Sequence, residues 1–155
     1  MKKIPFTRDG LNKFQAEYDS LQQRRKPAVD DLRSAREKGD LSENSAYRAA
    51  RSRLSSIDNR IRRLKALIDQ AHVVDNKDLE YADIGMHITI IDEGNESLTF
   101  RIVNTFESDL NHNQISSFSP LGKALMGKKV NDRVKVETPS GIKTYIVKSI
   151  SLENK

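Results

Sequence analysis

The sequence predicts an α+β fold, in which an antiparallel two-helix coiled-coil hairpin precedes a small antiparallel sheet with one short helix. Residues 8–71 contain one proline and two glycines, and their apolar side chains recur at heptad spacing. Residues 84–152 are instead rich in isoleucine, valine and threonine, with turn residues between short runs. The polar segment 72–83 separates these two residue patterns. We therefore expect a helical domain at 1–75 and a sheet domain at 76–155.

The first helix is expected to begin after Thr7, which can cap it, with Phe6 and Leu11 placed as a hydrophobic staple. Its apolar seam advances in alternating steps of three and four residues and includes one polar member, Arg25. Pro27 lies inside the seam and should cost about 3 kcal/mol in a helix interior. Because the seam continues beyond it, we expect a kink and not a stop. The seam consists of Leu11, Phe14, Tyr18, Leu21, Arg25, Ala28, Leu32 and Ala35.

A second seam allows the register of the hairpin to be derived. Residues that face each other in an antiparallel hairpin have numbers with a constant sum, and pairs such as Leu21 with Ile61 and Leu32 with Ala50 share the sum 82. The turn should then lie within a residue or two of Leu41, with arms of about 45 Å. The second seam consists of Ala50, Leu54, Ile57, Ile61, Leu64, Ile68 and Ala71.

The C-terminal half contains two predicted β-hairpins and one short helix. Residues 86–91 and 98–103 alternate in polarity around a turn at 92–96, and residues 133–138 and 142–151 flank Pro139-Ser140-Gly141. Between the hairpins, Ser119-Pro120 is typical of a helix N-cap followed by proline at the first helical position. That helix should run through Leu125.

Charge and composition narrow the function classes. The net charge is +5, and residues 1–75 hold 17 basic and 11 acidic residues; within 48–65, seven basic residues accompany Asp58 alone. This indicates an acidic partner such as nucleic acid, although a solvated helix face is the alternative. Cysteine is absent and the three histidines lack paired spacing, which argues against disulfide and zinc sites. We expect a cytoplasmic monomer without a signal peptide or membrane span.

The predicted hairpin tip, residues 39–44, carries Asp40 and Glu43 three positions apart. One interpretation is a capping box, with Asp40 as the N-cap and Glu43 as the third helical residue. The other is an incomplete metal site, because Mg²⁺ commonly takes one or two protein carboxylates and fills its other positions with phosphates and water. Arg48 and Arg51 follow one to two turns later and can meet phosphates or remain solvated.

Three motifs resemble one known family, the bacterial Gre transcript cleavage factors. They are the tip sequence Gly39–Tyr47 followed by Ala49-Ala50-Arg51, the N-terminal Ile4–Thr7, and Ser119–Lys128. The resemblance covers nearly the whole chain in the expected order. The GreA type fits best, whereas Ser42 and Ile57–Ile61 favour the GreB type.

The resemblance implies a coiled coil that enters the secondary channel of RNA polymerase and an FKBP-like C-terminal domain that docks at the channel entrance. It assigns Asp40 and Glu43 to a Mg²⁺ ion shared with the polymerase, which then cleaves the 3′ end of a backtracked nascent RNA. The factor would thus be an activator and not itself a nuclease. Contacts with RNA or polymerase are expected from Asn44, Tyr47, Arg48 and Arg51, and docking from Phe118, Ser119 and Pro120.

Three alternatives remain open from the sequence. A channel-binding regulator without cleavage stimulation would share the same architecture. A coiled-coil nucleic-acid binder would use the basic segment 48–65, and weak DNA contact is compatible with it. For Phe118, Ser119 and Pro120, the alternative to docking is helix capping and core packing.

Overall fold

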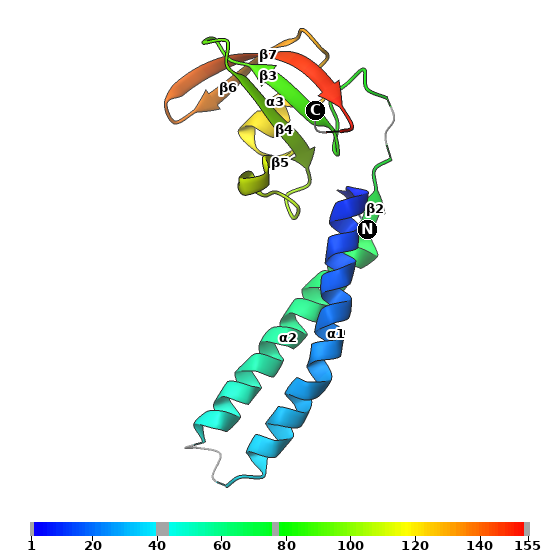
Figure 1. The fold of residues 1–155 in the computed structure, drawn as a ribbon, viewed down its shortest axis with the longest axis vertical. Coiled ribbons are helices and arrows are strands. Elements are labelled where there is room, and N and C mark those ends of the chain that lie inside the picture. Colours follow the sequence, from blue (N-terminus) through cyan, green and yellow to red (C-terminus); the bar gives the residue numbers. More distant parts are fainter. Residues whose placement is uncertain (1, 40–43, 76–77, 154–155) are drawn as a thin grey trace. The chain divides into compact units, whose positions relative to one another are not determined.

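The computed structural model describes residues 2–39, 44–75 and 78–153. The chain forms two compact units, which Figure 1 shows as a helical pair and a sheet with a short helix. One unit contains Met1–Lys2 and Leu11–Ala71, and the other contains Lys3–Gly10 together with His72–Lys155. The N-terminal segment thus packs with the sheet unit, although composition alone grouped it with the hairpin. An α+β fold is confirmed.

The helical unit consists of α1 (Arg8–Arg36), whose first turn lies in the sheet unit, and α2 (Ser45–Gln70). Three ion pairs join the two helices and show that they run antiparallel (Figure 1). The paired residue numbers have sums of 83, 84 and 77, which agree with the predicted 82 to within about a helical turn. The pairs are Arg25–Asp58 at 2.7 Å, Asp31–Arg53 at 3.3 Å and Glu17–Arg60 at 2.6 Å.

The hairpin is held together by the predicted seam. Leu21, Ala28, Ile57 and Leu64 are buried and form a cluster with flanking apolar residues from both helices. The apolar residues that flank this cluster are Phe14, Tyr18, Leu54, Ile61 and Ile68. α1 continues through Pro27, as the uninterrupted seam predicted.

The second unit is built on a five-stranded sheet in the order β5-β4-β3-β7-β6 (Figure 1). Both predicted β-hairpins are confirmed: β3 pairs antiparallel with β4, and β6 pairs antiparallel with β7. The short helix α3 follows β5, as predicted. The elements are β3 (His87–Ile91), β4 (Ser97–Val103), β5 (Gln114–Ser116), α3 (Pro120–Leu125), β6 (Arg133–Thr138) and β7 (Gly141–Ser151).

The expectation of a purely antiparallel sheet is wrong, because β5 pairs parallel with β4. The chain returns from the end of β4 through a turn and the 3₁₀ helix Leu110–His112, so β5 runs in the same direction as β4. β5 has three residues, of which only Ile115 is buried. So short a strand gives no alternation signal, which is why the sequence did not reveal it.

Two further short strands, β1 (Ile4–Phe6) and β2 (Ala71–Val73), pair with each other. The Val74 backbone N–H extends this pairing by donating to the Phe6 carbonyl at 2.9 Å. The five-stranded sheet and α3 share a core that is closed to solvent and includes Leu125 of α3. Its fully buried members include Met86, Ile88, Ile90, Ile102, Leu125 and Val147.

Candidate functional site

The first candidate site is the end of the hairpin. The proposed metal ligands Asp40 and Glu43 lie outside the described residues, but their flanks are defined. Asn44 joins the two helix ends: its Oδ1 accepts from the Tyr47 N–H at 3.1 Å, and its Nδ2 donates to the Ala35 carbonyl at 2.9 Å. A single side chain therefore caps α2 and satisfies a carbonyl in the last turn of α1.

This geometry removes one interpretation of the acidic pair. α2 begins at Ser45 and its N-cap is Asn44. A capping box with Asp40 as the cap and Glu43 as the third helical residue is therefore wrong, because Glu43 precedes the cap of α2. Asparagine caps about as well as aspartate, and the sequence pattern could not separate the two positions. The N-cap of α2 is thus Asn44 and not Asp40.

The other tip residues lie on the first two turns of α2. Tyr47 is half-buried, and the guanidinium of Arg36 lies 5.9 Å from its ring centroid, a cation–π distance that links the two helices. Arg48 and Arg51 are exposed and three positions apart, so they lie on one helix face. Within the described ranges, neither makes an ion pair. Both guanidinium groups are exposed on this face, where an anionic partner can reach them.

The predicted docking residues are in the loop that leads into α3. Ser119 is the N-cap: its hydroxyl accepts from the Gly122 N–H at 3.0 Å and donates to the Ser116 carbonyl at 2.7 Å. Pro120 is the first residue of the helix and is exposed. Phe118 is 70% exposed, so the core-packing alternative is wrong for this residue. The start of α3 accounts for Ser119 as the cap and for Pro120 as the first helical residue, but it leaves the exposed Phe118 unexplained.

Sequence reasoning missed a second exposed aromatic residue beside this loop. Phe106, in the turn after β4, is 52% exposed. The two turns are tied together, because Ser116 Oγ lies 2.9 Å from Thr105 Oγ1 and accepts from the Phe118 N–H at 3.1 Å. We call Phe106, Phe118 and Pro120 the apolar surface. A phenylalanine in a polar loop outside any periodic run was the signal that could have revealed Phe106.

A polar cluster surrounds the start of α1 within the same unit. Thr7 caps the helix, as predicted, by accepting from the Gly10 N–H at 3.0 Å. The Thr7 hydroxyl donates to Glu107 Oε1, and the Thr7 N–H donates to Glu107 Oε2 at 3.2 Å. Burial raises the pKa of the Glu107 carboxyl, and the hydrogen bonds from Thr7 partly oppose this shift.

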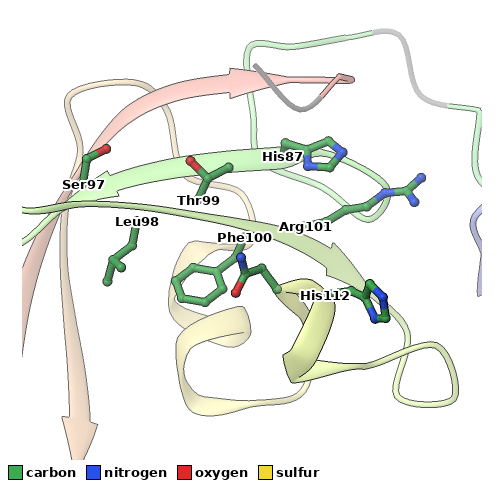
Figure 2. Close-up of a pocket in the computed structure, with 8 residues that line it drawn as sticks. His87, Ser97, Leu98, Thr99, Phe100, Arg101 and His112 are labelled. Carbon is green, nitrogen blue, oxygen red and sulfur yellow. The ribbon is translucent and has the colours of Figure 1, made fainter.

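A hollow of about 260 Å³ lies beside β3 and β4 and contains three potential cations (Figure 2). Arg101 already binds Asp9 and the Gly85 carbonyl. His112 Nδ1 lies 2.6 Å from Asp109 Oδ2. Burial, aided by the charge of Arg101, lowers the pKa of His87. The hollow is thus polar, but Arg101 and His112 already have hydrogen-bond partners, and the lowered pKa of His87 disfavours its charged form. In the described parts of the chain, no three or more His, Asp or Glu side chains are grouped to hold a metal ion.

Both halves of the chain match one protein family. Residues 4–73 match the profile described as "Transcription elongation factor, N-terminal", and residues 77–152 match "Transcription elongation factor, GreA/GreB, C-term". The chain belongs to the GreA/GreB family of transcription elongation factors. Its described helices include none with the length and apolar character of a membrane span.

Individual relatives match over nearly their full lengths. Transcription elongation factor GreA of Rhodospirillum rubrum is 44% identical over 151 residues, which is 95% of this chain and 96% of the relative. GreA of Novosphingobium aromaticivorans is 36% identical over 152 residues, or 97% and 96%. Among solved structures, GreA factor homolog 1 (Gfh1) of Thermus thermophilus is 25% identical with a TM-score of 0.47, and the match covers 96% of this chain and 99% of that one.

Proposed function

We propose that this protein binds RNA polymerase, inserts its hairpin into the secondary channel and stimulates Mg²⁺-dependent cleavage of backtracked nascent RNA. Family membership across both halves supports the partner and the class of activity. The observation that carries the chemistry is the position of the α2 cap. Because Asn44 caps α2, the helix does not require Asp40 as its cap, and this supports a role for Asp40 and Glu43 as ligands.

The cleavage chemistry belongs to the polymerase. Two carboxylates supply only part of the octahedral shell that Mg²⁺ requires, and phosphates and water commonly complete it. Asp40 and Glu43 would hold a Mg²⁺ ion together with groups of the polymerase and the RNA. When bound, that ion supplies Lewis-acid activation of the hydrolysis. The protein is thus an activator and does not act as a nuclease alone.

The remaining residues of the tip have separate roles in this proposal. Asn44 and Tyr47 position the tip, because both link α2 to α1. Arg48 and Arg51 are exposed and bind the RNA 3′ segment or acidic groups of the polymerase. The apolar surface docks on the polymerase, with Ser119 holding the α3 loop in place.

The same structure gives less support to a stand-alone nucleic-acid binder. Arg53 and Arg60 of the basic segment form ion pairs with carboxylates of α1, and Lys65 lies 3.0 Å from Asp69 of its own helix. These pairs engage three of the seven basic residues in segment 48–65. The remaining basic residues of the segment are compatible with weak DNA binding that falls steeply as the salt concentration rises.

The decisive experiment is transcript cleavage in a stalled, backtracked elongation complex. The Asp40→Asn, Glu43→Gln double variant keeps the shape of both side chains but removes both charges. It should bind polymerase normally, whereas stimulation should fall by at least about tenfold, because a neutral amide is a poorer Mg²⁺ ligand. Raised Mg²⁺ should restore part of the activity.

Glu37→Gln is the matched control, since Glu37 is an exposed carboxylate next to the tip. It should leave cleavage unchanged. Full stimulation by the double variant would overturn the metal role. Normal polymerase binding without any stimulation by the wild-type protein would instead identify a channel-binding regulator.

A further inference from the structure

We propose that the turn formed by residues 104–107 is a joint that positions α1, and with it the acidic tip, when the apolar surface engages the polymerase. This inference rests on the proposed function. The turn has two sides with different contacts. Glu107 and Asn104 bind the N-terminal segment that leads into α1, whereas Phe106 projects into solvent as part of the apolar surface.

The contacts to the N-terminal segment are specific and partly buried. Asn104 is 3% exposed, and its Nδ2 donates to the Pro5 carbonyl and to Glu107 Oε2, both at 2.7 Å. The Glu107 carboxylate thereby receives hydrogen bonds from Asn104, the Thr7 N–H and the Thr7 hydroxyl. A side chain at position 10 would prevent this arrangement, because a Cβ on Gly10 would lie 1.6 Å from Glu107 Oε1.

The contacts on the other side reach the apolar surface through the same asparagine. Asn104 Oδ1 accepts from the backbone N–H groups of Phe106 at 2.8 Å and Glu107 at 3.1 Å. The neighbouring Thr105 is linked through Ser116 to the backbone of Phe118. A partner that fixes Phe106 and Phe118 therefore also fixes the backbone that presents Glu107 to Thr7.

Small changes at the joint would have large effects at the far end of α1, because α1 is one continuous helix of 29 residues. At 1.5 Å per residue such a helix is about 43 Å long. A tilt of about 5° at its first turn would therefore move its far end by about 4 Å. A displacement of about 1 Å at a reacting centre can cost about 100-fold in rate. Docking without a defined first turn would thus leave the carboxylates misplaced.

The test separates positioning from docking. Glu107→Ala and Thr7→Val each break the joint, whereas Thr7→Ser keeps the hydroxyl that binds Glu107. Glu93→Gln is the control, because Glu93 is an exposed carboxylate in the β3–β4 turn. Each variant is assayed for melting temperature, for competition with the wild-type protein for polymerase, and for cleavage rate at saturating concentration.

We expect Glu107→Ala and Thr7→Val to compete within about threefold of the wild-type protein but to stimulate cleavage at least about fivefold less at saturation. Thr7→Ser and Glu93→Gln should match the wild-type protein. A loss of folded protein alone would be overcome by saturation, so a normal maximal rate in Glu107→Ala would overturn the inference.

A second measurement does not depend on cleavage. Because the chain contains no cysteine, spin labels can be placed at Lys26→Cys on α1 and Lys148→Cys on β7, both exposed positions. With polymerase bound, the distance distribution should be narrow in the wild-type background and clearly broader with Glu107→Ala. Equal widths would exclude the joint. Failure of the wild-type protein to stimulate cleavage would reject the proposed function, while the distance measurement would still decide the inference.

Discussion

Arg101 binds Asp9 through two hydrogen bonds of 2.7 and 2.9 Å, although the two residues are 92 positions apart. This bidentate pair joins β4 to the first turn of α1. The hydrogen bonds and charge of Arg101 lower the pKa of the Asp9 carboxyl from 3.8 to about 2. The ionised form of Asp9 is thus favoured in the folded protein.

The first prediction concerns the pH dependence that follows from this pair. Because the pKa of Asp9 is lower in the folded state, its stabilising effect is complete above about pH 4 and is lost as the pH falls through about 2. The Asp9 side chain is 58% exposed, so solvent screening limits the effect to about 1 kcal/mol. Urea unfolding of the wild-type protein and Asp9→Asn should differ by this amount at pH 6 and converge near pH 2. A constant difference across that range would contradict the assignment.

The second prediction concerns the cap shared by the two helices of the hairpin. Asn44→Ala removes both hydrogen bonds and should lower the free energy of unfolding by about 1–2 kcal/mol. Asn44→Asp keeps the acceptor for the Tyr47 N–H but loses the donor to Ala35, so its cost should be smaller. Circular dichroism during urea unfolding measures both. Equal losses in the two variants would show that the bond to Ala35 dominates.

The third prediction concerns the seam of the hairpin. Leu64 is fully buried against α1, and Leu64→Ala should cost about 3 kcal/mol through lost burial and the cavity left behind. Leu79→Ala removes the same atoms at an exposed position and should cost under about 0.5 kcal/mol. Helical circular dichroism during urea unfolding provides the comparison. A small effect at Leu64 would mean that the seam repacks without a cavity.

The fourth prediction concerns the close approach of α3 to β5. A Cβ on Gly122 would lie 2.0 Å from the Ser116 carbonyl oxygen, a backbone atom that cannot rotate away. Gly122→Ala should therefore destabilise the sheet unit by at least about 2 kcal/mol, despite the better helix propensity of alanine. Gly94→Ala is the control, because its Cβ would meet only the Asp92 side chain, with the nearest atom at 3.4 Å. Thermal unfolding should separate the two variants clearly.

The fifth prediction concerns docking. Phe106→Ala and Phe118→Ala should each weaken polymerase binding by about five- to tenfold, because exposed aromatic residues often dominate the energy of an interface. Ile142→Ala tests a similarly exposed apolar residue in the β6–β7 hairpin and should have little effect. Competition for polymerase with the labelled wild-type protein measures all three. Equal affinity of the phenylalanine variants and Ile142→Ala would place the docking contact elsewhere.

The helical hairpin and the two β-hairpins could be predicted because their buried side chains recur at the regular spacing of a helix or a strand. The seam that includes Leu21 and Leu64 predicted the antiparallel pairing, and alternation predicted the β3–β4 and β6–β7 hairpins. The strands β1 and β5 have three residues each, too few to establish an alternation. Their places depend on pairing with distant segments, which a local pattern does not contain.

The candidate site was only partly predictable for a related reason. Ser119 could be recognised as a cap because proline follows it at once. The contact between Thr7 and Glu107 joins positions 100 residues apart and leaves no local trace. At the tip, Asp40 and Asn44 were equally good caps by residue type, and only the observed start of α2 distinguishes them.

The position of β6 at the outer edge of the sheet has a consequence for how the protein behaves at high concentration. An edge strand offers unpaired backbone groups on which another chain can build. Along β6, buried Val134 and Val136 alternate with exposed Arg133, Lys135 and Glu137. Charged side chains on an edge strand, lysine above all, disfavour the addition of another strand. The same alternation that places Val134 and Val136 in the core thus places charged side chains on the other face of the edge strand, where they discourage edge-to-edge aggregation.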